Sequence, residues 1–247
     1  MASTPGVLEE GQVRAMFDRI AGIYDLLNSV MTVGLHHRWR SRAADLAAVG
    51  PGSRVLDVAT GTGDLAIELA GRGCEVVGSD FSAGMLERAR AKAPGLRWEQ
   101  GDALALPYAD DEFDAATVGF GARNFSDLDR GLSEMARVVR PGGRVVVLEI
   151  TTPTRAPLST FYRGWFDHVV PALGRVAGDA DAYSYLPSSV KRWPAPGDLA
   201  ARMERAGLDH LRWILTAGGI IALHVGEVGE SLRDPLAGST SSNSEAG

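Results

Sequence analysis

The chain has a single cysteine, Cys74, among its 247 residues. One thiol cannot form an internal disulfide, and it cannot build a zinc site made of cysteines. The first residues, MASTPGVLEEGQ, lack the basic start and the apolar run of a secretory signal. We therefore expect a protein of a reducing, cytoplasmic compartment.

Long apolar runs are also missing. A spanning helix needs about 18 consecutive apolar residues, whereas the most hydrophobic segments, such as RVVVLEI, have the length of a strand. Any contact with a membrane should therefore be peripheral. The net charge is -6, and the basic residues are scattered along the chain, which argues against nucleic acid as a partner.

What the chain does have is an alternation of short β-branched runs with helical patterns from residue 54 onward. Such alternation is typical of βαβ units. Glycine and proline lie between the segments, as in the Pro141-Gly142-Gly143 turn. We predict an α/β fold with a doubly wound, mostly parallel, seven-stranded sheet of the Rossmann-like kind. Its strands are expected at 54–59, 75–79, 96–100, 113–120, 144–150, 212–216 and 220–225.

Two segments stand outside this alternation. Residues 1–50 should form a helical cap, since Val13, Met16, Phe17 and Ile20 recur with helical spacing. Residues 155–196 should form an insertion in the α/β domain, which spans 51–228. The insertion carries an aromatic and aliphatic stripe, interpreted either as core or as a lipid channel, made of Phe161, Tyr162, Trp165, Phe166, Val169 and Val170. The small polar residues of 229–247 should be a disordered tail.

A glycine-rich loop, TGTGDLA, follows the first predicted strand and opens a helix. Gly61 and Gly63 allow a ligand to approach the backbone closely, and the helix amides beyond them favour an electron-rich group. With Ala66 the loop satisfies GxGxxA, the dinucleotide fingerprint. The alternative interpretation is a tight turn of any α/β protein.

Three carboxylates lie at the ends of consecutive predicted strands, and together they limit which class of ligand the site can bind. Asp57 precedes the glycine loop, where a carboxylate disfavours a pyrophosphate and favours a cationic or amine-bearing ligand. Asp80 ends the second strand, from which it can accept hydrogen bonds from ribose hydroxyls. Asp102 follows the third strand and can meet an adenine amino group, with backbone from Ala103, or it can cap a turn.

These motifs resemble the class I S-adenosylmethionine-dependent methyltransferases. More narrowly, the chain resembles the ubiquinone/menaquinone biosynthesis C-methyltransferase family. The family's YDxMNxxxSxxxHxxW signature matches at Tyr24, Asp25, Asn28, His36 and Trp39, with leucine in place of its methionine and threonine in place of its serine. RVVRPGG and the FGARN segment at 120–124 are also similar to family motifs, and the resemblance covers roughly residues 13–226.

The resemblance implies methyl transfer from S-adenosylmethionine to a ring carbon of a polyprenylated quinol, most simply demethylmenaquinol in menaquinone biosynthesis. The family's cofactor positions fall on Thr62, Asp80, Asp102 and Ala103, beside the glycine-loop backbone. The residue before FGxRN is often serine in the family and is Gly119 here. The polyprenyl tail implies an apolar groove and association with a membrane surface.

Catalysis should require that the quinol oxygen be ionised, so that electron density reaches the ring carbon. We expect Arg123 and Asn124, in the loop after the fourth strand, to face the cavity and stabilise the quinolate or order a water. The alternative is a structural ion pair and a turn cap. His36 and Tyr24 are further candidates. No metal site is expected, because adjacent residues on a helix, such as His36 and His37, point about 100° apart.

Several alternatives stay open at this point. An NAD-dependent oxidoreductase shares GxGxxA and the distal acid, although Asp57 disfavours it. A cofactor-binding regulator without chemistry shares the cofactor motifs, and methyltransferases of other phenols or of sterols share the fold. The sequence does not decide between a naphthoquinol and a benzoquinol, and it leaves prenyl length and oligomeric state undetermined.

Overall fold

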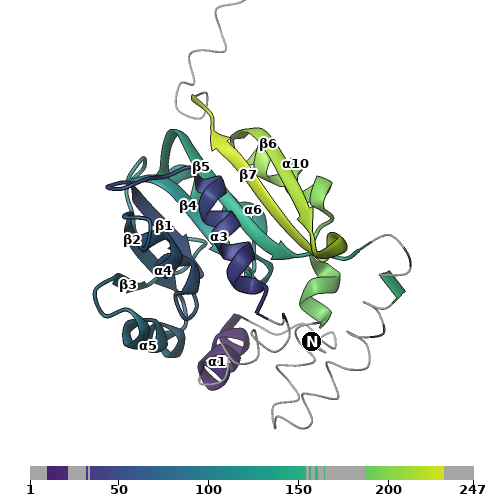
Figure 1. Cartoon of the computed structure of the whole chain (residues 1–247), viewed down its shortest axis with the longest axis horizontal. Helices are drawn as coiled ribbons and strands as arrows, with labels where there is room; N and C mark the ends of the chain where they lie inside the picture. The colour runs from purple at the N-terminus through teal and green to yellow at the C-terminus, as the bar shows by residue number, and fades with distance from the viewer. Residues whose placement is uncertain are drawn as a thin grey trace, which may run out of the picture.

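The computed structural model describes residues 10–21, 32, 34–153, 156, 159–160, 164 and 187–230. A seven-stranded sheet runs through this part of the chain in the order β3-β2-β1-β4-β5-β7-β6 (Figure 1). β7 is antiparallel to both of its neighbours, and the other adjacent strands pair in parallel. The predicted doubly wound, mostly parallel sheet is confirmed. Its strands are β1 (Arg54–Val58), β2 (Glu75–Asp80), β3 (Arg97–Gln100), β4 (Phe113–Gly119), β5 (Val139–Ile150), β6 (Leu208–Thr216) and β7 (Ile221–Val228).

Helices cover both faces of the sheet. One face carries α3 (His36–Ala47), α4 (Asp64–Ala70) and α5 (Ala83–Lys92), and the other carries α6 (Leu128–Val138) and α10 (Pro196–Arg205). The short helices η1 (Ala122–Asn124) and η3 (Ala217–Gly219) lie in loops. The middle strands are buried on both faces, because Val145 and Val147 of β5 pack toward α6 while Val146 and Leu148 pack toward α3 and α4. This double burial explains why the strand reads as a continuous apolar run.

Two strands are longer than the sequence predicts. β5 starts at Val139 and includes the Pro-Gly-Gly turn, because Val139 already pairs with Phe113 before a shift of register. β6 starts at Leu208 rather than at Arg212, and its register with β7 also shifts along the way. In both cases the extra length comes from pairing with a neighbouring strand, which local periodicity does not report.

The helix α1 (Glu10–Ile20) lies beside α5, near one end of the sheet (Figure 1). Its buried residues include Val13, Met16 and Ile20, as the predicted apolar stripe requires. Asp18 accepts hydrogen bonds from the Ser82 hydroxyl at 2.5 Å and from the Gly84 amide at 3.0 Å, at the start of α5. The first turn of α5 is thus capped in part by a carboxylate from α1.

Several predicted segments lie outside the described residues. These are most of the signature stretch between 22 and 33, the aromatic stripe of 161–170 and residues 231–247 of the predicted tail. The division into a cap (1–50), an α/β domain (51–228) and an insertion (155–196) therefore stays a prediction.

Candidate cofactor and active site

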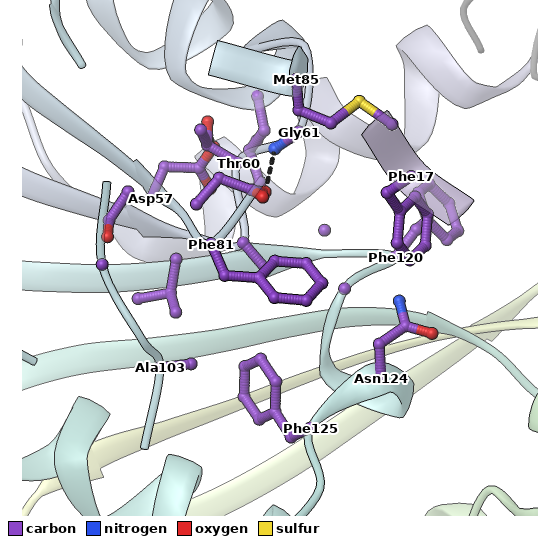
Figure 2. Close-up of a pocket in the computed structure, with 18 of the residues that line it drawn as sticks. Phe17, Asp57, Thr60, Gly61, Phe81, Met85, Ala103, Phe120, Asn124 and Phe125 are labelled. Carbon is purple, nitrogen blue, oxygen red and sulfur yellow. Dashed lines mark hydrogen bonds between the residues drawn. The ribbon is translucent and has the colours of Figure 1, made fainter. Parts of the chain in front are cut away.

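A cavity opens at the carboxyl ends of β1, β2 and β4, where the sheet order reverses (Figure 2). Ligands of open α/β sheets bind at such a switch point. The cavity brings together all the predicted cofactor residues except Gly63: it is lined by Asp57, Gly61, Thr62, Asp80, Asp102, Ala103 and Gly119. Residues from β1, β2, β4 and the loops that follow them therefore meet at one place.

The glycine loop takes a backbone form that few residues tolerate. Gly61 and Gly63 have φ values of 58° and 86°. A Cβ on Gly63 would overlap the Trp98 ring, so glycine is required there on two grounds. Ala59 has a φ of 50°, which explains why many methyltransferases place a glycine at this position.

Asp57 lies at the floor of the cavity and is only 1% exposed. Its carboxylate accepts hydrogen bonds from the Thr60 hydroxyl at 2.5 Å and from the Thr117 hydroxyl at 2.7 Å. Burial raises the pKa of Asp57 to about 6, against the lowering effect of these two hydroxyls and of the charge on Arg40. The prediction that this side chain borders the ligand fits its place on the cavity lining.

Asp80 ends β2 and is also buried. Its two carboxylate oxygens accept hydrogen bonds from the backbone amides of Gly61 at 2.8 Å and Ser82 at 2.9 Å. Burial raises the pKa of Asp80 to about 6, and the amides oppose this rise. Because the Gly61 amide is already bound to a carboxylate, it is not directed at a phosphate, as a dinucleotide site would require.

The remaining cofactor positions lie around the same cavity. Asp102 is exposed, and its side chain accepts a hydrogen bond from the Leu104 amide at 2.8 Å, so it also caps a turn. The Thr62 hydroxyl accepts a hydrogen bond from the Lys92 ammonium at 2.9 Å. Gly63 is the residue before α4 and shapes the loop without lining the cavity.

The two catalytic candidates of η1 differ in position. Asn124 lines the cavity, as Figure 2 shows. Arg123 does not, contrary to our expectation: its guanidinium pairs with Glu149 at 2.7 Å and donates to the Phe120 carbonyl at 2.5 Å. Because Glu149 is fully buried, its charge requires a cation beside it. Arg123 thus forms the structural ion pair that the sequence left as the alternative.

His36, at the start of α3, is 2% exposed and is not part of the cavity lining. Its Nδ1 lies 2.7 Å from the Thr32 hydroxyl, and its ring centroid lies 4.0 Å from that of His37. Tyr24 lies outside the described residues. The catalytic roles of both residues stay predictions.

Sequence reasoning missed an arginine and several aromatic residues of the cavity. Arg40 of α3 is buried, lines the cavity and pairs with Asp64 at 3.1 Å. Its position one residue after the YDxMN signature carried no signal of its own. Figure 2 shows aromatic rings around the same space, from Phe17, Phe81, Phe120 and Phe125. Phe17 lies on α1, Phe81 directly after β2, and Phe120 and Phe125 on either side of η1, so no local pattern joins all four.

The residues that the structure describes contain no group of three or more histidine, cysteine, aspartate or glutamate side chains able to hold a metal ion. No helix among them is long and apolar enough to cross a bilayer.

The sheet order and the position of the cavity define the class of protein: the fold is that of the class I methyltransferases. A solved SAM-dependent methyltransferase from Thermotoga maritima matches it with a TM-score of 0.59, over 87% of this chain and 98% of that one, at 20% identity. Identity this low supports the fold alone.

The family follows from sequence similarity. The model of the ubiE/COQ5 methyltransferase family matches residues 6–228, and the chain belongs to this family. The chain is 48% identical to the demethylmenaquinone methyltransferase of Thermus thermophilus, over 86% of this chain and 99% of the relative. It is also 48% identical to that of Deinococcus radiodurans, over 89% and 94% respectively. The protein is thus an S-adenosylmethionine-dependent methyltransferase.

The cavity fits this cofactor better than a dinucleotide. Asp57 and Asp80 place two carboxylates beside the glycine loop, where a pyrophosphate would be repelled. S-adenosylmethionine carries no phosphate. It offers ribose hydroxyls, an amine and a sulfonium, each of which suits a carboxylate. The NAD-dependent alternative is therefore not favoured.

Proposed function

We propose that this enzyme transfers a methyl group from S-adenosylmethionine to a ring carbon of demethylmenaquinol and so forms menaquinol. The observation that carries the proposal is 48% identity to two demethylmenaquinone methyltransferases over nearly their whole length. The aromatic rings of the cavity support it, because a flat naphthoquinol ring is expected to pack between such side chains.

The cofactor-binding roles follow from the cavity lining. Asp80 is expected to accept hydrogen bonds from the ribose hydroxyls, and Asp102, with the backbone of Ala103, is expected to bind the adenine. Phe81, directly after Asp80 in the chain, also lines the cavity and offers an apolar wall. Thr62, Gly61 and Gly119 would form the remaining contact surface, chiefly through backbone atoms, and Gly63 would keep the shape of the loop. Gly119 has no side chain with which to replace the serine that the family often has there.

The methyl group of the sulfonium is already electrophilic, so the protein must orient the quinol and make its ring carbon nucleophilic. Loss of the proton from the neighbouring hydroxyl places electron density on that carbon. Asn124 lines the cavity and can donate an amide hydrogen bond to the resulting oxyanion or to a water that takes up the proton. We assign it this role.

Arg123 is proposed to act through its neighbours. Its guanidinium binds Glu149 and the carbonyl of Phe120, whose ring lines the cavity, and its backbone precedes Asn124 directly. It is therefore a positioning residue for the loop that carries Asn124. His36 and Tyr24 remain second-rank candidates for contact with the quinol.

The polyprenyl tail gives a reason for peripheral association with the inner face of a membrane. Flotation with lipid vesicles tests this directly, with and without the quinol. We expect the protein to float with the vesicles when substrate is present. Absence from the lipid fraction in both conditions would contradict this part of the proposal.

The choice of substrate is tested by competition. Equal amounts of a demethylated naphthoquinol and a demethylated benzoquinol, both with the same short prenyl chain, are offered with S-adenosylmethionine under reducing conditions. Mass spectrometry should find the methyl group mainly on the naphthoquinol. Preferred methylation of the benzoquinol would instead support a role in ubiquinone biosynthesis.

A further inference from the structure

Arg40 of α3 is a charged side chain that is buried at the wall of the cavity. Its side chain is only 8% exposed, and it lines the cavity. A guanidinium has five N–H donors and stays charged at any physiological pH. Burial of such a group is costly unless acceptors surround it.

The acceptors within the described residues are few. Nη1 of Arg40 lies 3.1 Å from the Asp64 carboxylate, but the direction of approach does not make a hydrogen bond, and the described part of the chain offers this nitrogen no other partner. The guanidinium carbon lies 5.8 Å from the centre of the Phe120 ring, which provides a face but no acceptor.

Asp64 is also shared between two cations. Lys92 binds its other oxygen at 2.7 Å from the opposite side, and the charges of both Arg40 and Lys92 lower the pKa of this carboxyl. One carboxylate cannot neutralise two cations. The neighbouring acid, Asp57, directs its two oxygens to hydroxyl groups and does not pair with Arg40. The charge of Arg40 also acts on Asp57, so the two acids balance the two cations, and what remains at this wall is an unused donor of Arg40.

An acceptor carried by a ligand would complete this wall. S-adenosylmethionine has one carboxylate, at the amino-acid end. That group is repelled from the part of the cavity that carries Asp80 and Asp102, and it is attracted to the part near the start of α4, where Arg40 lies. We propose that Arg40 binds the carboxylate of the amino-acid end of S-adenosylmethionine, and that Asp64 holds the guanidinium in place for it.

This inference depends on cofactor binding and not on which quinol is methylated. An alternative role for the charge of Arg40 would be to stabilise the ionised quinol. The two roles can be separated, because only binding of the cofactor carboxylate changes cofactor affinity in the absence of any quinol.

The test compares two ligands that differ in one group. S-adenosylhomocysteine carries the carboxylate, and its decarboxylated analogue keeps the amine and the adenosyl part. Dissociation constants are measured by calorimetry for the native protein and for Arg40→Met. A charged hydrogen bond contributes about 1.5–3 kcal/mol, which corresponds to a loss of about 10- to 100-fold. Arg40→Met should lose this factor for S-adenosylhomocysteine and bind the analogue as the native protein does.

Two further variants complete the design. Arg40→Lys keeps the charge, and it should recover part of the affinity for S-adenosylhomocysteine alone. Lys92→Met removes the other cation from Asp64, and it should change the affinities for the two ligands by similar factors. Normal binding of the analogue shows that the cavity of each Arg40 variant is folded.

Three results would overturn the inference. Equal weakening of both ligands by Arg40→Met would make Arg40 a structural residue. Unchanged binding of both, together with a raised KM for the quinol, would place its charge on the substrate. If Arg40→Met fails to fold, equal weakening of both ligands by Arg40→Lys would contradict the inference in the same way. Failure of the native protein to bind S-adenosylhomocysteine would instead contradict the cofactor itself.

Discussion

Asp80 combines two properties at a single residue: it lies in the cofactor cavity, and burial raises its pKa to about 6. In the folded protein the carboxyl is protonated below that pH, whereas in the unfolded chain it ionises near 3.8. Between about pH 4 and 6 the folded state therefore binds more protons at this site, so the contribution of Asp80 to the free energy of unfolding falls as pH rises through this window.

The affinity for the cofactor should change with pH in the opposite direction. If the ionised carboxylate accepts the ribose hydroxyls, affinity for S-adenosylhomocysteine should rise as pH increases toward 6, by up to about tenfold per pH unit for one proton. Calorimetry from pH 5 to 8 measures this slope. In Asp80→Asn the slope should be smaller, while Asp102→Asn serves as the exposed control. Parallel pH profiles for Asp80→Asn and the native protein would show that Asp80 does not control binding.

The Arg123 and Glu149 pair makes a residue-scale prediction of another kind. Arg123→Ala leaves a fully buried carboxylate without its cation, a change that typically costs about 3–5 kcal/mol. We expect a strong loss of stability and of turnover, with cofactor affinity retained in the fraction that is folded. Thermal unfolding and single-turnover methyl transfer measure the two effects.

A second variant separates structure from catalysis. Arg123→Ala with Glu149→Gln removes the stranded charge and keeps one acceptor oxygen, which can serve the backbone amide of either Arg123 or Ile150. Stability should largely return, while turnover stays about 100-fold or more below that of the native protein, in the range of lost proton-transfer catalysis. Turnover near the native value in this double variant would mean that Arg123 has a structural role alone.

At the scale of elements, α1 closes one side of the cavity. Phe17 of α1 contributes a ring to the lining, and it lies edge-to-face against Phe81 with 6.2 Å between ring centres. The Arg14 guanidinium of α1 donates a hydrogen bond to the Phe81 carbonyl at 2.7 Å, which connects the helix to the loop after β2. A cofactor bound in this cavity would therefore lie beside α1.

Asp18 should control how often α1 separates from α5. Asp18→Ala removes the hydrogen bonds to Ser82 and Gly84, a change of about 1 kcal/mol for a helix cap. Amide hydrogen exchange in α1 should become several-fold faster, with β1 and β4 unchanged. Asp18→Asn keeps the acceptor oxygen without the charge and should give an intermediate rate. If exchange in α1 is unaltered by Asp18→Ala, the hydrogen bonds of Asp18 do not hold the helix against α5.

For the whole molecule, the sequence was most informative where local rules decide the outcome. Strand and helix periodicity predicted the seven strands, since burial on both faces or on one face leaves a direct mark on residue order. The carboxyl ends of parallel strands meet at one edge, so Asp57, Asp80 and Asp102 were expected together, and they line one cavity.

The sequence was least informative about side chains whose partners are distant in the chain. The ion pair of Arg123 depends on Glu149, 26 residues away on another strand, and no spacing rule reports that contact. Arg40 was missed for the same reason, because its position over the cavity depends on how α3 packs against α4 and the sheet. The strand extensions of β5 and β6 likewise depend on pairing rather than on local preference.

The central claim is that a methyl group moves from S-adenosylmethionine to a carbon of a naphthoquinol ring. The most direct measurement supplies the purified protein with demethylmenaquinol and S-adenosylmethionine labelled with ¹³C in the methyl group. Nuclear magnetic resonance of the product should find the labelled methyl bonded to a ring carbon of menaquinol. A label found on a quinol oxygen, or no transfer at all to this substrate, would contradict the claim.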